Sequence, residues 1–316
     1  MVERGGGTRA SGRGVSATAL KFQLGARTLG SIRRELVRVS VDLDDALAER
    51  LPELPALPHD AHGYLVTSLA EARRADLTRT SGASIAHVRQ RYVRYHADLT
   101  LGYDAYLATL SAGTRAQLRR KTRRVEAVSG PLRVDRFAAA DDIERFHAVA
   151  RRISARTYQE RLLGGGLPGD AGFVGRMVAA AAADRVRAWL LTIAGEPAAY
   201  LYCEAQGDVL RYDHVGHDPA FGELSPGSVL MLAAFRDLMV ERRFARFDFT
   251  EGEGQHKRQF ATGGVACCDL LLLRRTVANR LTVAALGGFD WFAETAKALA
   301  THPSLKGLAQ RVRRAS

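Results

Sequence analysis

The stretch DHVGHDPAFGELSPGSVLM, residues 213–231, decides the fold class of this chain. A strand runs into a glycine-containing loop, and a helix then opens with Ser225, Pro226 and Gly227. Serine suits the N-cap of a helix, and proline suits its first position. Because the first-turn amides lack partners within the helix and the helix dipole is positive there, the pattern predicts an anion site. A capped helix without a ligand has the same sequence, so the surrounding elements must decide between the two.

The elements around this stretch follow a specific order. Alternation and helical periodicity predict β-α-α-β-β-β-α-β-α-β over residues 132–273. Three of the strands, 187–194, 198–205 and 209–216, are joined by glycine-containing turns that are typical of hairpins. A doubly wound sheet would alternate strand and helix throughout, and a sandwich would lack the helices. We therefore expect an α/β (α+β) fold in which helices flank a mixed central sheet.

Changes in composition divide the chain into four parts. The first is rich in Gly, Ser and Arg and predicts a disordered basic arm. A smaller α/β region follows and ends in a basic helix within a helical stretch from about 103 to 127, and Ser-Gly-Pro at 129–131 then indicates a boundary. The last part predicts a helical, basic tail with a glycine break at 287–288. The expected parts are 1–30, 31–128, 129–275 and 276–316.

The composition excludes several classes of protein. With 47% apolar and 25% charged residues, the 316-residue chain is neither fibrous nor wholly disordered. Three cysteines without a CxxC pair exclude a disulfide scaffold or a zinc ribbon. No run approaches 18 apolar residues, and the N-terminus lacks the apolar core of a signal peptide. We expect a soluble protein of the cytoplasm.

The net charge of +12 is concentrated in three segments. Residues 1–40 and 115–136 each carry eight Lys or Arg against two acids, and 301–316 add four with no acid. Such patches attract polyanions, namely nucleic acid, phosphorylated cofactors or acidic membranes, although a solvated arginine-rich face has the same sequence. The basic segments contain no interleaved aromatic residues to stack bases, which argues against nucleic acid.

Three segments, in order, carry a resemblance to a known family. They are RAQLRRKTRRVE (115–126), SPG (225–227) and FDFTEG (247–252) followed by His256 and Lys257. Together with the element order, they resemble the GNAT acyltransferase superfamily, over roughly residues 100–273. Within it, the sequence is similar to the CelD/BcsL-like acetyltransferases of cellulose and exopolysaccharide biosynthesis, to which the Fem-type aminoacyl transferases are related. This chain departs from that pattern at His256, where an aromatic residue is common.

The resemblance implies acetyl-CoA or a longer acyl-CoA as cosubstrate and no metal. In the superfamily, the pyrophosphate of coenzyme A binds the loop after the fourth strand and the helix that follows. Carried over to this sequence, the implied cofactor-binding residues are Gly222, Leu224, Ser225, Gly227 and Ser228.

Acyl transfer from a thioester to an amine needs a neutral amine, a donor for the oxyanion and a proton for the leaving thiolate. In folds of this kind, much of the rate comes from holding two substrates together, so a dedicated base is optional. We expect His214, Asp248 and Lys257 to be catalytic. Each has a structural alternative as a sheet, capping or surface residue. The expected substrate-binding residues are Tyr202, Glu204, Asp213, Glu251, Arg119 and Lys121.

Other candidate chemistry is weaker. Cys267 and Cys268 are adjacent in an apolar strand, which favours core packing over nucleophilic catalysis. His59 and His62 lie in a proline-bounded loop with no third ligand in the pattern.

Three functions remain open at this stage. The first is an N-acyltransferase with an amino-sugar or other amine as acceptor, in envelope or exopolysaccharide metabolism. The second is a Fem-type aminoacyl transfer from charged tRNA. The third is a non-catalytic protein on the same scaffold that binds nucleic acid or a membrane surface. The sequence leaves open the acceptor, the acyl length, the oligomeric state and the role of the N-terminal region.

Overall fold

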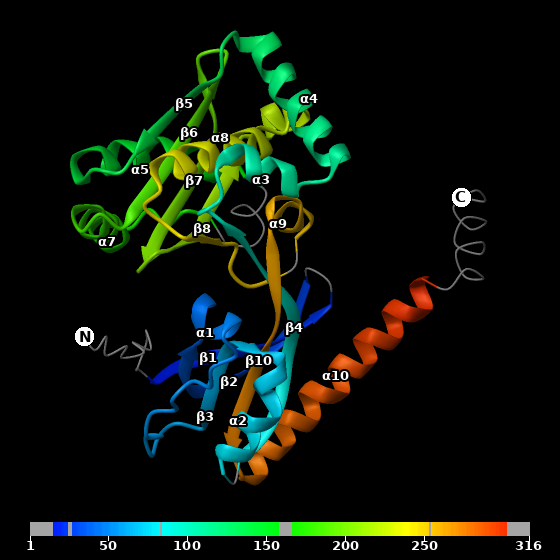
Figure 1. The fold of residues 1–316 in the computed structure, drawn as a ribbon. Helices are drawn as coiled ribbons and strands as arrows, with labels where there is room; N and C mark the ends of the chain where they lie inside the picture. Colours follow the sequence, from blue (N-terminus) through cyan, green and yellow to red (C-terminus); the bar gives the residue numbers. More distant parts are fainter. Residues whose placement is uncertain (1–14, 25–26, 83, 158–165, 253, 302–316) are drawn as a thin grey trace. The chain divides into compact units, whose positions relative to one another are not determined.

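The computed structural model describes residues 15–24, 27–82, 84–157, 166–252 and 254–301 (Figure 1). The chain forms two compact units. One combines Met1–Tyr92 with Ala266–Ser316, and the other is Val93–Val265. Two long strands, β4 (Ser84–Asp98) and β10 (Gly263–Arg274), contribute residues to both units. The boundary expected at 129 does not coincide with this division, because residues on both sides of it lie in the second unit.

The first unit contains strands in the order β1-β2-β3-β10-β4. β1 pairs antiparallel with β2, β2 parallel with β3, and β3 antiparallel with β10. Leucines from these strands and from the last helix form its core, Leu20, Leu36, Leu65, Leu271, Leu273 and Leu286. Its remaining elements are β1 (Val15–Leu24), β2 (Arg27–Ser40), α1 (Leu43–Leu47), β3 (Gly63–Ala70), η1 (Glu71–Arg73), α2 (Arg74–Thr80) and α10 (Val277–Thr301).

Two sequence predictions for this unit are wrong. Val15–Leu24 and residues 27–30 are strand, not disordered arm, because they pair with each other in a hairpin and Leu20 is buried in the core. The glycine break at 287–288 is absent: α10 continues through both glycines, which a helix accommodates at about 1 kcal/mol each. The rest of the predicted arm, residues 1–14, and the end of the tail, 302–316, lie outside the described residues.

The second unit contains strands in the order β4-β9-β8-β7-β6-β5. All neighbours are antiparallel except β8 and β9. The predicted element order from 132 to 273 is confirmed, and the fold is a mixed α/β sheet flanked by helices. The strands are β5 (Arg133–Phe137), β6 (Val186–Ile193), β7 (Glu196–Gln206), β8 (Val209–His217) and β9 (Arg246–Asp248).

Helices pack on both faces of this sheet. On one face, α3 (Tyr103–Thr109), α4 (Ala112–Ser129) and α8 (Pro226–Glu241) share a core with the sheet. On the other face, α5 (Ala140–Arg156) and α7 (Ala171–Ala182) form a second core. Successive strand residues pack into opposite cores. On β6, Leu190 packs with α5 and α7, and Leu191 packs with α3, α4 and α8.

The short elements complete the second unit. η2 (Pro219–Leu224) joins β8 to α8, and α9 (Gln255–Phe260) joins β9 to β10. The helical stretch predicted from 103 to 127 is two helices, and Ser111 caps the second by accepting a hydrogen bond from the Thr114 amide at 3.1 Å. No helix in the described part of the chain combines the length and the apolar character that a membrane span requires.

Candidate functional site

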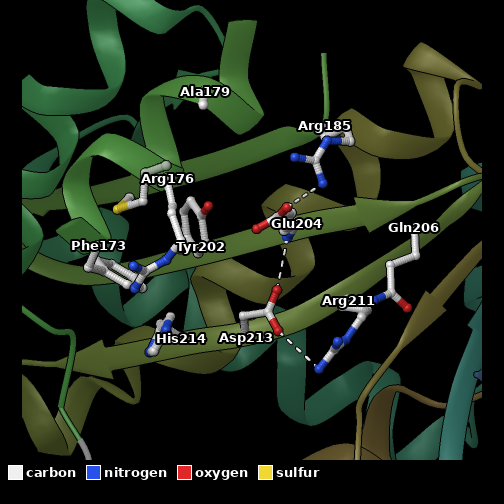
Figure 2. A pocket seen from close by; sticks show the side chains of 11 residues that line it. Phe173, Arg176, Ala179, Arg185, Tyr202, Glu204, Gln206, Arg211, Asp213 and His214 are labelled. Carbon is white, nitrogen blue, oxygen red and sulfur yellow. Dashed lines mark hydrogen bonds and ion pairs between the residues drawn. The ribbon is translucent and has the colours of Figure 1, made fainter. Parts of the chain in front are cut away.

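A bulge in β8 places two neighbouring polar residues on one face of the sheet. Tyr202 on β7 pairs with His214, but the next residue, Cys203, pairs with Tyr212, so Asp213 is the extra residue. A bulge interrupts the alternation of a strand. Asp213 and His214 therefore both line a cavity of about 570 Å³ on the α7 side of the sheet (Figure 2).

This cavity, the carboxylate pocket, collects four of the residues that the sequence analysis selected. Tyr202 and Glu204, two positions apart on β7, face it together with Asp213 and His214. Its other lining residues come from β7, β8, α7 and the turn after α7: Phe173, Arg176, Met177, Ala179, Arg185, Gln206 and Arg211.

Asp213 is the most perturbed acid of the pocket. Burial raises its pKa to about 6, and Arg211, whose Nη2 lies 3.4 Å from Oδ1, offsets only part of that effect. The Glu204 amide donates a hydrogen bond to Oδ2 at 3.2 Å. A carboxyl group with this pKa can accept a proton near neutral pH.

Burial favours the neutral forms of two neighbours of Asp213, His214 and Tyr202. His214 lies between the rings of Phe173 and Tyr202, with centroids 5.4 and 6.1 Å away, and burial lowers its pKa. Burial also raises the pKa of Tyr202, so its hydroxyl stays protonated. Glu204 forms an ion pair with Arg185 at 2.6 Å. Asp213 and His214 are therefore both candidates for the base.

The pairing between β8 and β9 is short, because β9 ends at Asp248. Their parallel pairing covers three residue pairs, from Val209–Arg246 to Arg211–Asp248, and β8 then continues to His217. Tyr212 is the first residue beyond the pairing, and its hydroxyl lies 3.3 Å from Nε2 of His256 on α9. Beyond Arg211, β8 therefore continues without pairing to β9, and Tyr212 packs against the core on the α8 side of the sheet.

The N-terminus of α8 follows the open end of β8. Ser225 occupies the N-cap position, but its side chain makes no capping hydrogen bond, because its backbone is left-handed with φ 54° and ψ 51°. The prediction that the Ser225 side chain caps α8 is therefore wrong. A Cβ added at Gly227 would meet nothing within 4 Å, so the space in front of the first turn is open. Gly222, in η2, is equally open, and Leu224 and Ser228 flank the turn.

Lys121 from α4 reaches this helix end. Its Nζ donates a hydrogen bond to Oγ of Ser228 at 3.0 Å, and burial, with a contribution from Arg120, lowers its pKa. The sequence analysis assigned Lys121 to the binding of the acceptor. In the structure it lies beside the N-terminus of α8, where the pyrophosphate of coenzyme A is predicted to bind. Arg119, assigned with it, is exposed on α4.

Asp218, which the sequence analysis did not select, holds the connecting segment. Its Oδ1 accepts a hydrogen bond from the Ala220 amide at 3.0 Å, and Oδ2 pairs with Nη1 of Arg156 at 2.7 Å. The Asp-Pro pair that opens η2 is a capping signal that could have identified it.

The other predicted catalytic residues are held by internal partners. Asp248 is fully buried, and its two oxygens bond the guanidinium of Arg94 at 3.1 and 2.5 Å. Lys257 is buried, and its Nζ donates to the carbonyl oxygen of Glu251 at 2.5 Å, while the Glu251 side chain is exposed. None of the three lines the carboxylate pocket. This geometry gives Asp248 and Lys257 internal partners, and their catalytic roles stay predictions.

Two further features that the sequence analysis considered are the cysteines and groups of metal-ligating side chains. Cys267 and Cys268 are buried, and burial raises the pKa of the Cys268 thiol to about 12, which suits a packing role. Within the described residues, no group of three His, Cys, Asp or Glu side chains is arranged to hold a metal ion.

Comparisons with known proteins fit this geometry. Residues 112–258 match the family described as the Acetyltransferase (GNAT) domain. A solved C-terminal domain from Agrobacterium fabrum, described as part of a lysylphosphatidylglycerol synthetase, has a TM-score of 0.50 at 10% identity over 72% of each chain. The fold is GNAT-like. The matched segment includes β8, α8 and most of α9, and the match supports a transferase.

Two further structures score lower. FemX has a TM-score of 0.49 at 10% identity, over 85% of this chain and 91% of its own. The L-PGS structure from Bacillus licheniformis has a TM-score of 0.44 at 13% identity, over 70% and 71%. No curated protein matches the sequence. The fold assignment depends on the family match and the Agrobacterium structure.

Proposed function

We propose that the protein is an N-acyltransferase that moves an acetyl or longer acyl group from acyl-CoA to an amine. The observation that carries this proposal is the N-terminus of α8 within the GNAT-matched segment. There, a Cβ at Gly227 would meet open space, and the ammonium of Lys121 bonds the hydroxyl of the next residue, Ser228. No carboxylate of the described residues forms an ion pair with Lys121. Helix amides and a lysine together suit a pyrophosphate.

The two faces of the sheet then serve the two substrates. The acyl donor binds along α8, and its thioester reaches the acceptor where β8 and β9 separate, beyond Arg211 and Asp248. The acceptor amine binds in the carboxylate pocket, on the opposite face. Holding both substrates at this opening supplies much of the rate.

The side chains of the pocket supply the proton transfers. The amine transfers a proton to Asp213 or His214, its nitrogen attacks the thioester carbon, and the carbon–sulfur bond breaks. The leaving thiolate takes a proton from the Tyr212 hydroxyl, which His256 holds at 3.3 Å on the α9 side. The products are an amide and the free thiol. We assign Asp248 and Lys257 positioning roles instead of the catalytic roles that the sequence suggested.

The acceptor class and the biological setting have weaker support. The CelD/BcsL-like resemblance supports an amino-sugar acceptor in envelope or exopolysaccharide biosynthesis, and an acyl-CoA donor favours action in the cytoplasm. The Fem-type alternative keeps the same fold with charged tRNA as donor, and no contact in the described residues favours it over acyl-CoA.

A thermal-shift titration with acetyl-CoA, with adenosine diphosphate as control ligand, tests the donor. A ligand at 100 times its Kd stabilises the folded state by about 2.7 kcal/mol. Gly227→Glu places a carboxylate in the open space without a clash and abolishes the acetyl-CoA shift. Gly288→Glu, at an equally open glycine of α10, leaves the shift unchanged.

The other outcomes discriminate the alternatives. No acetyl-CoA shift, together with amino-acid transfer from charged tRNA, supports the Fem-type reaction. Salt-dependent binding of nucleic acid or anionic vesicles without any transfer supports the non-catalytic protein. A normal shift in folded Gly227→Glu places the donor elsewhere.

A further inference from the structure

The charges of the carboxylate pocket are unequal, and the imbalance bears on what the acceptor must be. Three arginines line the pocket against two carboxylates. Arg185 pairs with Glu204 at 2.6 Å, and Arg211 pairs with Asp213 at 3.4 Å. Each carboxylate therefore already has a cation beside it, and the third guanidinium, that of Arg176, is left over.

Arg176 is exposed and lies over an aromatic ring. Its guanidinium carbon lies 5.7 Å from the centroid of the Phe173 ring, one turn earlier on α7. In the described part of the chain, no carboxylate lies within ion-pair distance of Arg176. A guanidinium over a ring keeps its N–H groups available to bind a carboxylate or a phosphate in a bidentate manner.

The pocket has a definite polarity from one side to the other. Figure 2 shows Arg176, Phe173 and His214 at one side, Tyr202, Glu204 and Asp213 in the middle, and Arg185 and Arg211 beyond them. An ammonium or amine is attracted to the middle, where the two carboxylates lie. A group attached to that amine and directed away from Arg185 and Arg211 approaches Arg176.

From this arrangement we propose that the acceptor is zwitterionic: an amine that carries a carboxylate or a phosphate nearby, with the anionic group bound by Arg176. The proposal rests on the proposed acyl transfer and names its substrate class. The cavity of about 570 Å³ accommodates an amino acid or an amino-sugar phosphate. An amine without an anionic group leaves Arg176 without a partner and binds less tightly.

Paired acceptors test the proposal. The enzyme is assayed with acetyl-CoA, and release of free thiol is followed for the common amino acids against their decarboxylated amines, and for hexosamine phosphates against hexosamines. We expect kcat/KM at least tenfold higher for the anionic member of one set. A preference among the amino acids identifies the bound anionic group as a carboxylate, and a preference among the hexosamines identifies it as a phosphate. Equal or higher rates with the neutral members overturn the proposal, as does acetylation of no member by a protein that binds acetyl-CoA.

Variants assign the preference to Arg176. Arg176→Gln brings the ratio of kcat/KM between the anionic member and its neutral partner close to one, and Arg176→Lys restores part of that ratio. Arg145→Gln is the matched control, because Arg145 lies in a similar way over Phe137, 5.6 Å from its centroid, and does not line the pocket. A preference that survives in Arg176→Gln overturns the assignment.

The acetyl-CoA titration separates two kinds of failure. Absence of an acetyl-CoA shift in the wild-type protein contradicts the proposed function itself. A normal shift in wild type and Arg176→Gln, without discrimination between paired acceptors, contradicts the zwitterionic acceptor alone.

Discussion

Two neighbouring parallel strands of the second unit, β8 and β9, are each followed by a helix, yet their charged residues have opposite surroundings. At β9, the carboxylate of Asp248 is buried against Arg94, and Lys257 bonds a backbone carbonyl. At β8, the Asp213 carboxylate lies 3.4 Å from Arg211 in a pocket, and Lys121 bonds the hydroxyl of Ser228 at the start of the next helix. The same residue types occur in both regions.

The difference shows which charges are available for chemistry. A buried acid with a bidentate cation has its charge satisfied, so a substrate would have to displace that cation. An acid whose pKa is raised to about 6 by burial lacks full compensation, as catalytic acids and bases often do. We therefore assign the reactive groups to β8 and the supporting groups to β9.

The largest expected effect is on stability at β9. Asp248→Ala removes the carboxylate that forms a buried ion pair with the Arg94 guanidinium, which costs about 3–5 kcal/mol of unfolding free energy. Urea unfolding measures this loss. The double variant Arg94→Met with Asp248→Leu also removes the buried positive charge, and most of the stability returns. A loss below about 1 kcal/mol in Asp248→Ala would remove the contrast between the strands.

A milder variant checks the same residue in the reaction. Asp248→Asn keeps the shape of the side chain and an acceptor for the Thr250 amide, which now bonds Oδ1 at 2.8 Å. We expect kcat to change by less than tenfold. A fall of 100-fold or more, in a folded protein that binds acetyl-CoA, would restore the catalytic role that the sequence suggested.

The next effect is on turnover at β8. Asp213→Asn removes the proposed base, and we expect kcat/KM to fall about 100-fold. With an acceptor amine of high pKa, the wild-type logarithmic profile has slope two below about pH 6 and slope one above it, because Asp213 and the amine must both lose a proton. Asp213→Asn has slope one throughout. If the break persists there and disappears in His214→Gln, the base is His214.

Asp213 also makes a smaller contribution to stability that depends on pH. Its pKa is 3.8 without the fold and about 6 within it, so the folded protein holds the proton more tightly. Stability of the wild type therefore falls as pH rises from about 4 to 6, relative to Asp213→Asn, and the difference is constant above that range. The full shift corresponds to about 3 kcal/mol. With 23% of the side chain exposed, we expect about 2 kcal/mol in favour of Asp213→Asn at pH 7.5. Equal thermal stability of both proteins at pH 4 and pH 7.5 would contradict the burial of this charge.

The sequence predicted what depends on local pattern and missed what depends on distant partners. The element order follows from periodicity and turn residues, which neighbours along the chain determine. The partner of Asp248 lies 154 residues away, and Ser228 lies 107 residues from Lys121. No local signal indicates either contact. The bulge at Asp213 likewise depends on the register between β7 and β8, so facing predicted from simple alternation could not place Asp213 beside His214 in one pocket.

The smallest effect is on the lysine of the β8 region. Lys121→Ala removes a half-buried ammonium beside the first turn of α8, and we expect the Kd for acetyl-CoA to rise about tenfold, equivalent to about 1.4 kcal/mol. Arg123→Ala is the matched control, because Arg123 is exposed on the same helix and two positions away, about 200° around its axis. Calorimetric titration at two salt concentrations checks both variants. A larger loss in Arg123→Ala than in Lys121→Ala would move the anion to the outer face of α4. In that case the solvent-exposed Arg123 would bind the anion of acetyl-CoA, and Lys121 would have a structural role, like Lys257.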